Sequence, residues 1–175
     1  MRRNSIIFIL ILVITMSFGC SKEENTQIPD EPNSSGVINL YFSDEQAQYL
    51  LPEEREISPL TINKAFEQLV LGPNNKNLYS TLPPKVELID VHIENNIAVL
   101  NINKELYLAM NGNYGTSTAS RMLLNSLVGT IVYNEVFQVD GIKILIEGKD
   151  DVSLGQYGVL NIIYPNEEVF KREEE

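Results

Sequence analysis

The acidic side chains that could serve as a general acid and a general base lie in or just after one β-branched stretch of the chain. Asp90 and Glu94 belong to that stretch, and Glu105 follows it. Two carboxyl groups can cleave a glycosidic bond when one protonates the leaving group and the other activates water or attacks the sugar. The sequence therefore leaves a hydrolytic enzyme open as one hypothesis.

Metal ligands and strong nucleophiles are scarce. His92 is the only histidine and Cys20 the only cysteine. A structural zinc site needs several Cys or His ligands, and a thiol nucleophile needs a neighbouring base. We therefore interpret His92 as structural or solvated and predict no metal site and no cofactor.

The N-terminus has the pattern of an export signal. Arg2 and Arg3 precede an apolar run over residues 6–18, which is short for a transmembrane helix but typical of a signal peptide. The residues before Cys20 resemble a bacterial lipobox, in which the cysteine is acylated and the signal is removed. We expect residues 1–19 to be a signal peptide and Cys20 to carry lipid. An uncleaved anchor and an ordinary secreted chain are the alternatives.

Residues 20–35 predict a disordered tether after the lipidated cysteine, because they are polar, charged and proline-containing. Flexible chain of this length has a root-mean-square reach of roughly 20 Å. A domain that starts at Gly36 would therefore stay close to the outer face of the membrane.

The charge balance excludes nucleic acid as a partner. The chain has 24 Asp and Glu against 13 Lys and Arg, and Arg2 and Arg3 would leave with the signal, so the mature charge is −13. This charge repels phosphate backbones and other anionic polymers. One charged run, residues 53–56, is interpreted as the solvated edge of a strand.

A helix is predicted from residue 59 to residue 71. Ser58 can cap it, and Pro59 suits the first helical position because the N–H that proline lacks would have no helical partner. Gly72 and Pro73 end the helix. The apolar stripe at helical spacing consists of Ile62, Ala65, Phe66, Leu69 and Val70.

Asn95 and Asn96 predict the turn of a β-hairpin, because asparagine tolerates the positive φ angles of a two-residue turn. With this turn one face of the hairpin is apolar and the other is mostly polar. A one-residue slip would exchange the faces, so the pattern supports the register. The apolar face consists of Ile89, Val91, Ile93, Ala98, Leu100 and Ile102.

The remaining segments complete an α+β fold. We predict strands at residues 37–42 and 49–57, a short helical or irregular segment at 104–110, a helix from Thr116 or Ser117 to about residue 134, and a strand at 142–146. The apolar faces of these elements have to be buried against each other. This predicts a small mixed or antiparallel sheet with two helices on one face and an extra hairpin at the start of the domain. Residues 161–175 are predicted to be a frayed acidic tail.

In their order and spacing, four short sequences resemble the GerMN domain, a module of sporulation and spore-germination proteins. They are Leu51-Pro52-Glu53-Glu54-Arg55, Leu71-Gly72-Pro73, Leu82-Pro83-Pro84 and Glu147-Gly148-Lys149. The resemblance covers residues 36–160. It implies a fold similar to the ring-building modules of sporulation secretion complexes.

The resemblance also implies a function. It points to a non-enzymatic envelope lipoprotein of a spore-forming bacterium, extracytoplasmic and lipid-anchored, that acts in sporulation or germination. Its partners would be envelope or sporulation-complex proteins, with peptidoglycan and a second copy of the chain as further candidates. The alternative is an enzyme or a regulator of peptidoglycan remodelling that uses the carboxylates named above.

Tyr79, in the loop of residues 74–85, and Tyr114, in the loop of residues 111–115, are the candidate partner-binding residues. Exposed tyrosines supply large contact area at small entropic cost and are frequent hot spots of binding. The alternative is that both rings pack down as anchors of their loops.

Overall fold

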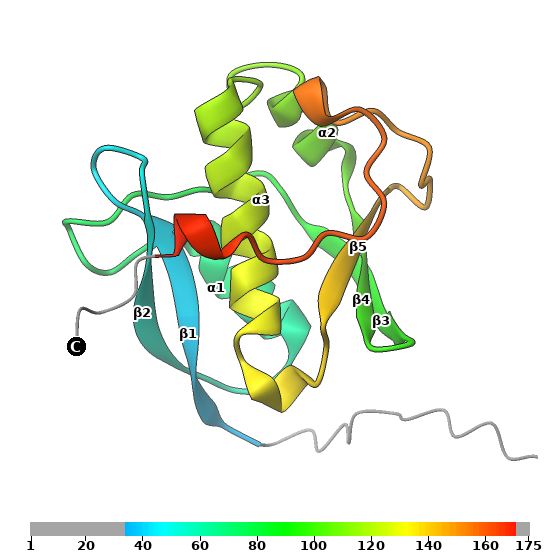
Figure 1. The fold of residues 1–175 in the computed structure, drawn as a ribbon. Coiled ribbons are helices and arrows are strands. Elements are labelled where there is room, and N and C mark those ends of the chain that lie inside the picture. Colours follow the sequence, from blue (N-terminus) through cyan, green and yellow to red (C-terminus); the bar gives the residue numbers. More distant parts are fainter. Residues whose placement is uncertain (1–33, 171–175) are drawn as a thin grey trace, which may run out of the picture.

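The computed structural model describes residues 34–170 of the 175-residue chain. The predicted signal peptide, Cys20, most of the predicted tether and residues 171–175 lie outside this range. Within it, strands and helices form an α+β fold (Figure 1), which confirms the predicted fold class. In chain order the elements are β1 (Gly36–Ser43), β2 (Leu50–Ile57), α1 (Ile62–Leu71), β3 (Leu88–Glu94), β4 (Ile97–Ile102), α2 (Lys104–Met110), α3 (Ser117–Val132) and β5 (Gly141–Ile146).

The strands form two separate sheets. β1 and β2 make an antiparallel hairpin, in which Gly36 lies opposite Ile57 at one end and Ser43 opposite Leu50 at the other. The second sheet has the order β3-β4-β5, with β3 antiparallel and β5 parallel to β4. Parallel neighbours need a long connection, and here α2 and α3 lie within it. The extra first hairpin and the mixed sheet are therefore both present.

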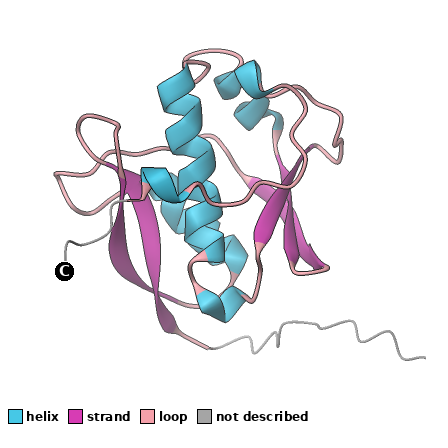
Figure 2. Ribbon diagram, viewed as in Figure 1, coloured by secondary structure: helices cyan, strands magenta, loops and turns pink. Residues whose placement is uncertain are grey.

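Helix α3 lies between the two sheets (Figures 1 and 2), in contact with β1 and β2 on one side and β5 on the other. Helix α1 packs against β3 and also contacts α3, so the two helices cover one face of the three-stranded sheet, as predicted. Leu127 and Ile131 of α3 have no exposed surface. The main core thus fills the space between the helices and both sheets.

Helix α1 begins later than predicted. Its N-cap is Thr61, whose side chain accepts a hydrogen bond from the Lys64 N–H at 3.2 Å, so the predicted cap at Ser58 is wrong. The predicted end is confirmed: the helix finishes at Leu71, and Gly72 takes a φ of +86°, which glycine adopts without a Cβ clash. Of the predicted stripe, Ile62, Ala65, Phe66 and Leu69 are buried.

The hairpin of β3 and β4 has the predicted turn and register. Asn95 and Asn96 have φ angles of 50° and 60°, and the pairs beyond them follow in order from Glu94 and Ile97. Ile89 is the exception to the predicted apolar face, because β3 carries one extra residue at this point and the pairing shifts. The Ile89 residue is 53% exposed instead of buried.

Residues 161–170 return across the domain, so the predicted frayed tail does not begin at residue 161. Ile163 and Ile142 exchange backbone hydrogen bonds of 2.8 and 2.9 Å, and Val169 has no exposed surface. The Phe170 ring lies edge-on to the rings of Tyr41 and Tyr133, with centroid distances of 5.2 and 4.8 Å. Packing therefore continues to the end of the described range.

Candidate functional site

Polar side chains of α3 close the outer edge of β1. Asn134, just after the helix, accepts from the Asn39 N–H at 2.9 Å and donates to the Asn39 carbonyl at 2.8 Å. One turn earlier, the Thr130 hydroxyl accepts from the Tyr41 N–H at 3.1 Å. Two turns earlier, the Ser126 hydroxyl donates to the Tyr41 carbonyl at 2.5 Å. The spacing of four residues places these three side chains on one side of the helix. This role is not evident from the sequence, because such polar residues are also typical of a solvated helix face.

These contacts fix the direction of α3 along the hairpin. The C-terminal end of the helix lies near Asn39, so its N-terminal end extends past Ser43, at the end of the hairpin opposite Gly36 (Figure 1). The loop of residues 111–115 leads into that N-terminal end. We call this end of the domain, with the turn between β1 and β2, the distal end.

The loop that contains Tyr79 also reaches the distal end. Tyr79 and Ser43 exchange backbone hydrogen bonds of 3.1 and 2.9 Å, so Tyr79 stands beside the last residue of β1. Leu78 and Leu82 anchor the loop and are only 7% and 2% exposed, whereas Tyr79 is 49% exposed. The candidate tyrosine is therefore held at the surface by buried neighbours.

Tyr49 is a second exposed tyrosine at the distal end, and it is not among the residues predicted to bind a partner. The Asp44 N–H donates to the Tyr49 carbonyl at 3.0 Å, which closes the turn between β1 and β2. The Asp44 carboxylate accepts from the N–H groups of Gln48 and Tyr49 at 2.7 and 3.2 Å. Tyr49 is 41% exposed. We call Tyr49 and Tyr79 the distal tyrosine pair.

Tyr114 lies at the distal end as well, but it is partly buried and packs against the main core. Its N–H donates to the Ala109 carbonyl at 3.0 Å, and its carbonyl accepts from the Ser120 hydroxyl at 2.6 Å. Backbone bonds hold the loops of both tyrosines, so the difference between them is burial: Tyr79 is exposed and Tyr114 packs against the core.

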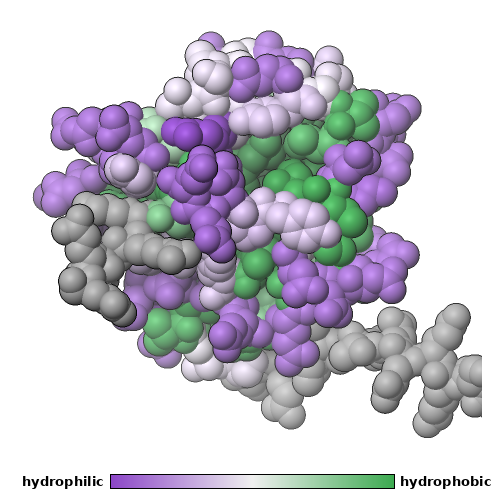
Figure 3. All heavy atoms as spheres, viewed as in Figure 1, coloured by the Kyte–Doolittle hydropathy of each residue, from purple (hydrophilic) through white to green (hydrophobic). Residues whose placement is uncertain are grey.

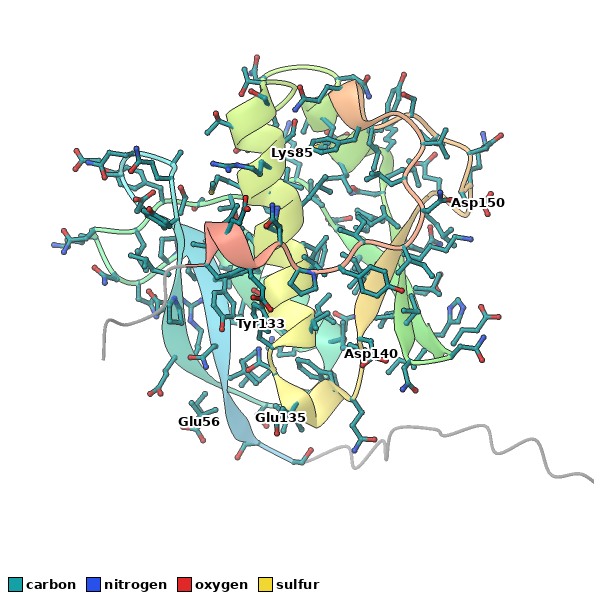
Figure 4. The ribbon with its side chains drawn as sticks, viewed as in Figure 1. Glu56, Lys85, Tyr133, Glu135, Asp140 and Asp150 are labelled. Atoms are coloured by element: carbon teal, nitrogen blue, oxygen red, sulfur yellow. The ribbon has the colours of Figure 1, made fainter. Side chains whose placement is uncertain are left out.

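The chain enters the domain at the opposite end, where β1 begins at Gly36. Figure 4 shows the acidic side chains of Glu56, Glu135 and Asp140 at this end. In the view of Figure 3, apolar residues reach the surface in separate areas between polar ones. On that face no single apolar area is distinguished as a binding surface.

The charged run of β2 is divided between two environments. Glu54 and Glu56 are exposed, as predicted for a solvated edge. Glu53 and Arg55 alternate with them and point toward the core, with side chains 12% and 10% exposed, so the prediction is wrong for these two. Side chains alternate between the faces of a strand, which explains how one run can supply both.

The ion pair of Glu53 and Arg55 ties β2 to the end of α1. The Arg55 guanidinium donates to the carbonyl oxygens of Gln68 and Gly72 at 3.1 Å each, and the last carbonyls of a helix otherwise lack partners. The Glu53 carboxylate accepts from the N–H groups of residues 74 and 75 at 2.9 and 2.8 Å. Two of the short sequences that carry the family resemblance thus bind each other, which is a structural role.

The same contacts set the protonation of Glu53. Burial acts to raise the pKa of this carboxyl group, but the N–H groups of Asn75 and Asn74 and the Arg55 guanidinium outweigh burial and hold the pKa below its ordinary value. The carboxylate is therefore stabilised in its charged form. A charged, fully hydrogen-bonded carboxylate is suited to holding structure and not to donating a proton.

Asp90 and Glu94, two of the carboxylates considered for acid–base catalysis, are separated along β3. Asp90 and Glu94 lie on the exposed face of β3 on either side of His92, and Glu105 lies in the first turn of α2. Four residues of strand separate backbone positions by about 13 Å, whereas paired glycosidase carboxyl groups are about 5 to 9.5 Å apart. Asp90 instead accepts a hydrogen bond from Asn101 at 2.9 Å.

Two further properties concern the described part of the chain alone. Among residues 34–170, no three His, Asp or Glu side chains are arranged to hold a metal ion. None of the helices in this range has the length and apolar character needed to cross a bilayer.

Comparison with solved structures gives the same fold. The chain is similar to the tandem GerMN domains of the sporulation protein GerM from Bacillus subtilis, with 19% identity and a TM-score of 0.62 over 85% of this chain and 51% of that one. It therefore spans about half the length of that relative. The first GerMN domain of the same protein matches with 19% identity and a TM-score of 0.56, over 79% of this chain and 99% of that one.

A putative lipoprotein from Clostridium perfringens is similar too, with 24% identity and a TM-score of 0.51, over 75% of this chain and 88% of that one. At these identities the likeness shows the fold alone. No curated protein matched the sequence.

A protein-family model provides the assignment that the structures cannot. Residues 39–152 match the model described as Germane, sporulation and spore germination. The matched segment runs from the hairpin of β1 and β2 through β5, and so includes the Glu53–Arg55 ion pair, the polar side of α3 and Tyr79. The chain therefore belongs to the Germane, or GerMN, family of sporulation and spore-germination domains.

Proposed function

We propose that this chain is a lipid-anchored, non-enzymatic envelope protein of a spore-forming bacterium, whose domain binds partner proteins or cell-wall material in sporulation or germination. Lipid on Cys20 would hold the domain at the outer face of the cytoplasmic membrane. The family membership supports the process, and the placement of the tyrosines supports the mode of action.

The observation that carries the proposal is that the distal tyrosine pair lies at the end of the domain opposite Gly36, the residue at which the predicted tether would join. A flexible tether joined at Gly36 would leave the distal end uncovered and accessible to other components of the envelope. Tyr79 and Tyr49 are 49% and 41% exposed there, and tyrosine rings bring large contact area with few rotatable bonds. The distal tyrosine pair is therefore the proposed contact surface.

The test uses the mature chain with Cys20→Ala, so that it can be studied in solution. Self-association is measured by sedimentation velocity, and binding to purified peptidoglycan by co-sedimentation. Tyr79→Ala is expected to weaken the observed association by about tenfold or more, as at a binding hot spot, without changing the thermal midpoint. Tyr164→Ala, at a residue that is 58% exposed on the C-terminal segment, is the matched control.

Tyr114→Ala distinguishes packing from binding. Because this ring packs against the core, its removal should lower the thermal midpoint by several degrees. If Tyr79→Ala lowers the midpoint in the same way and leaves binding unchanged, Tyr79 belongs to packing and is withdrawn from the site. In cells, Tyr79→Ala should reduce the yield of heat-resistant spores, while Tyr164→Ala should not.

An enzymatic role is tested separately. The same mature chain is incubated with peptidoglycan, and soluble fragments are measured for the unchanged chain and for Asp90→Asn, Glu94→Gln and Glu105→Gln. The proposal expects no release in any sample. Fragment release that one of these variants abolishes would overturn it in favour of peptidoglycan remodelling.

A further inference from the structure

Three of the four outer strand edges in the described domain are closed or protected. The outer edge of β1 is paired with α3 and Tyr79, as described above. On β5, Ile142 pairs with Ile163, and the Ile146 N–H donates to the Lys149 carbonyl at 2.9 Å. Partners of this kind remove the open hydrogen-bonding groups that would otherwise attract another strand.

The outer edge of β2 is protected by different means. Leu50 at its start forms a bridge with Phe170. Pro52 has no N–H to offer, which is typical of an edge strand. Glu54 and Glu56 follow with exposed charged side chains, and charge on an edge discourages pairing.

The outer edge of β3 also carries charged side chains, but among residues 34–170 it has neither a bridging segment nor a proline. In a two-residue hairpin the residues that flank the turn, here Glu94 and Ile97, form a hydrogen-bonded pair, and hydrogen-bonded pairs then alternate along the strands. The backbone groups of Glu94 and His92 therefore bond to β4. The N–H and C=O groups of Val91 and Ile93 point away from β4, toward the outer edge. No residue between 34 and 170 makes a backbone hydrogen bond or bridge to these groups. The extra residue at Ile89 limits how far a pairing could extend.

The side chains of β3 indicate what could pair there. On the core face, Val91 and Ile93 are only partly buried, although they pack against the main core. On the other face Asp90, His92 and Glu94 are exposed, so two carboxylates stand on either side of one imidazole. A strand laid along this edge would cover the two apolar side chains and would bring its alternate residues beside the two carboxylates.

A second copy of the chain does not suit this edge. Antiparallel pairing that uses both Val91 and Ile93 would place Asp90 of one copy opposite Glu94 of the other. Like charges directly opposite each other in a sheet are destabilising. A segment with basic residues at those positions would instead gain two favourable cross-strand pairs.

We propose that the outer edge of β3 is a docking site for an extended segment of another polypeptide, which adds an antiparallel strand with apolar residues toward the core and basic residues beside Asp90 and Glu94. Backbone hydrogen bonds supply affinity in this mode, and alternate side chains supply specificity. The site is separate from the distal tyrosine pair and is independent of the function proposed above.

The probe is a capped nine-residue peptide with the central order lysine, valine, threonine, valine, lysine and two threonines on each side. Binding to the mature chain is followed by NMR. Hydrogen exchange at the amides of Val91 and Ile93 should slow when the peptide binds, while exchange at His92, which already bonds to β4, should not change. Unchanged exchange at Val91 and Ile93 would overturn the proposal.

Matched peptides separate backbone pairing from charge attraction. N-methylation of the two valines blocks the N–H groups that face β3 and should abolish binding, whereas N-methylation of the two lysines should be tolerated. Any other pattern contradicts antiparallel addition at this edge. Replacement of both lysines by glutamate should weaken binding about tenfold.

Protein variants locate the charge. Asp90→Asn with Glu94→Gln should weaken binding of the lysine peptide by between about two- and thirtyfold. Glu54→Gln with Glu56→Gln makes the same change of charge on β2 and should leave affinity within about twofold. Equal losses of affinity in both variants would mean that the peptide responds to the net charge of the domain and does not bind at this edge. If Asp90→Asn with Glu94→Gln strengthens self-association of the chain, the edge belongs to a second copy and the proposal is wrong.

Discussion

At the scale of single residues, Glu53 and Arg55 form an ion pair that holds together parts of the domain distant in sequence. Each has a side chain that is nearly covered, and each is bonded to backbone groups at the end of α1 as well as to the other. The ion pair thus replaces water as the partner of helix-end and loop groups. Removal of one member leaves the other buried and uncompensated, which costs more than the pair itself contributes.

Glu53→Gln is therefore expected to lower the free energy of unfolding by about 2–4 kcal/mol, because the Arg55 guanidinium loses its counter-ion. Denaturation in urea at neutral pH measures the change. Glu54→Gln alters the neighbouring, exposed residue and should change the free energy by less than about 0.5 kcal/mol. Similar losses in both variants would show that burial of Glu53 has no special effect.

The lowered pKa of Glu53 also makes stability depend on pH. Because the pKa is lower in the folded chain than in the unfolded one, the unfolded chain binds more protons between the two values, and stability falls as pH falls. The contribution is complete above the unfolded pKa of about 4.3 and is lost as pH falls through the folded pKa.

The unchanged chain should therefore lose stability in acid more steeply than Glu53→Gln does. Urea denaturation of both chains from about pH 7 to about pH 3 gives the comparison, since other carboxylates are common to both. The difference in unfolding free energy should shrink toward the acid end. A difference that stays constant over this range would contradict the assignment of the pKa shift to Glu53.

At the scale of elements, α3 is the helix on which the arrangement depends. It contacts both sheets, and its polar side chains Ser126 and Thr130 have no exposed surface. They serve an edge strand that would otherwise expose its N–H and C=O groups. The helix therefore joins the first hairpin to the domain by hydrogen bonds as well as by apolar packing.

Thr130→Val tests this role with almost no change of shape. Valine cannot accept a hydrogen bond, so the Tyr41 N–H would be left unpaired, at a cost of about 1–3 kcal/mol in unfolding free energy. Thr118→Val makes the same change at an exposed position of α3 and should be nearly neutral. Amide exchange should become faster at Tyr41 in the first variant only. Equal stability of the two variants would mean that α3 does not pair with the edge.

At the scale of the whole molecule, the domain has two unlike ends. Glu56, Glu135 and Asp140 lie at the end where β1 begins, and the distal tyrosine pair lies at the other. Anionic lipids repel carboxylates that come within about a Debye length of the surface. In the proposed lipoprotein, the tether would keep the Gly36 end near the bilayer, while this charge would oppose close contact between that end and an anionic membrane surface.

Cys20→Ala should abolish processing by the lipoprotein route and leave the chain with its signal peptide or release it from the membrane. Several acyl chains on one cysteine hold a protein firmly, because each buried CH₂ contributes about 0.8 kcal/mol, whereas a single chain holds only marginally. Fractionation of cells and mass spectrometry of the N-terminus measure the result. Ser21→Ala is the control. A variant that is cleaved and membrane-bound like the unchanged chain would disprove the lipid anchor.

What the sequence by itself determined is the structure whose causes are local. The turn at Asn95 and Asn96, the stop at Gly72 and the apolar stripe of α1 each follow from the conformational preferences of a few consecutive residues. The mixed α+β arrangement follows from the same patterns, because their apolar faces have to be buried together.

Only the tertiary structure decided which polar residues are buried and what they bind. Asn134 pairs with a residue 95 positions earlier, and Glu53 accepts from a loop 22 positions later. A solvated polar residue and a buried, paired one look alike in a sequence, since the difference lies in partners that only folding brings near. For the same reason Tyr79 and Tyr114 appeared equivalent, and the packing of their loops separates the exposed ring from the one that is partly buried.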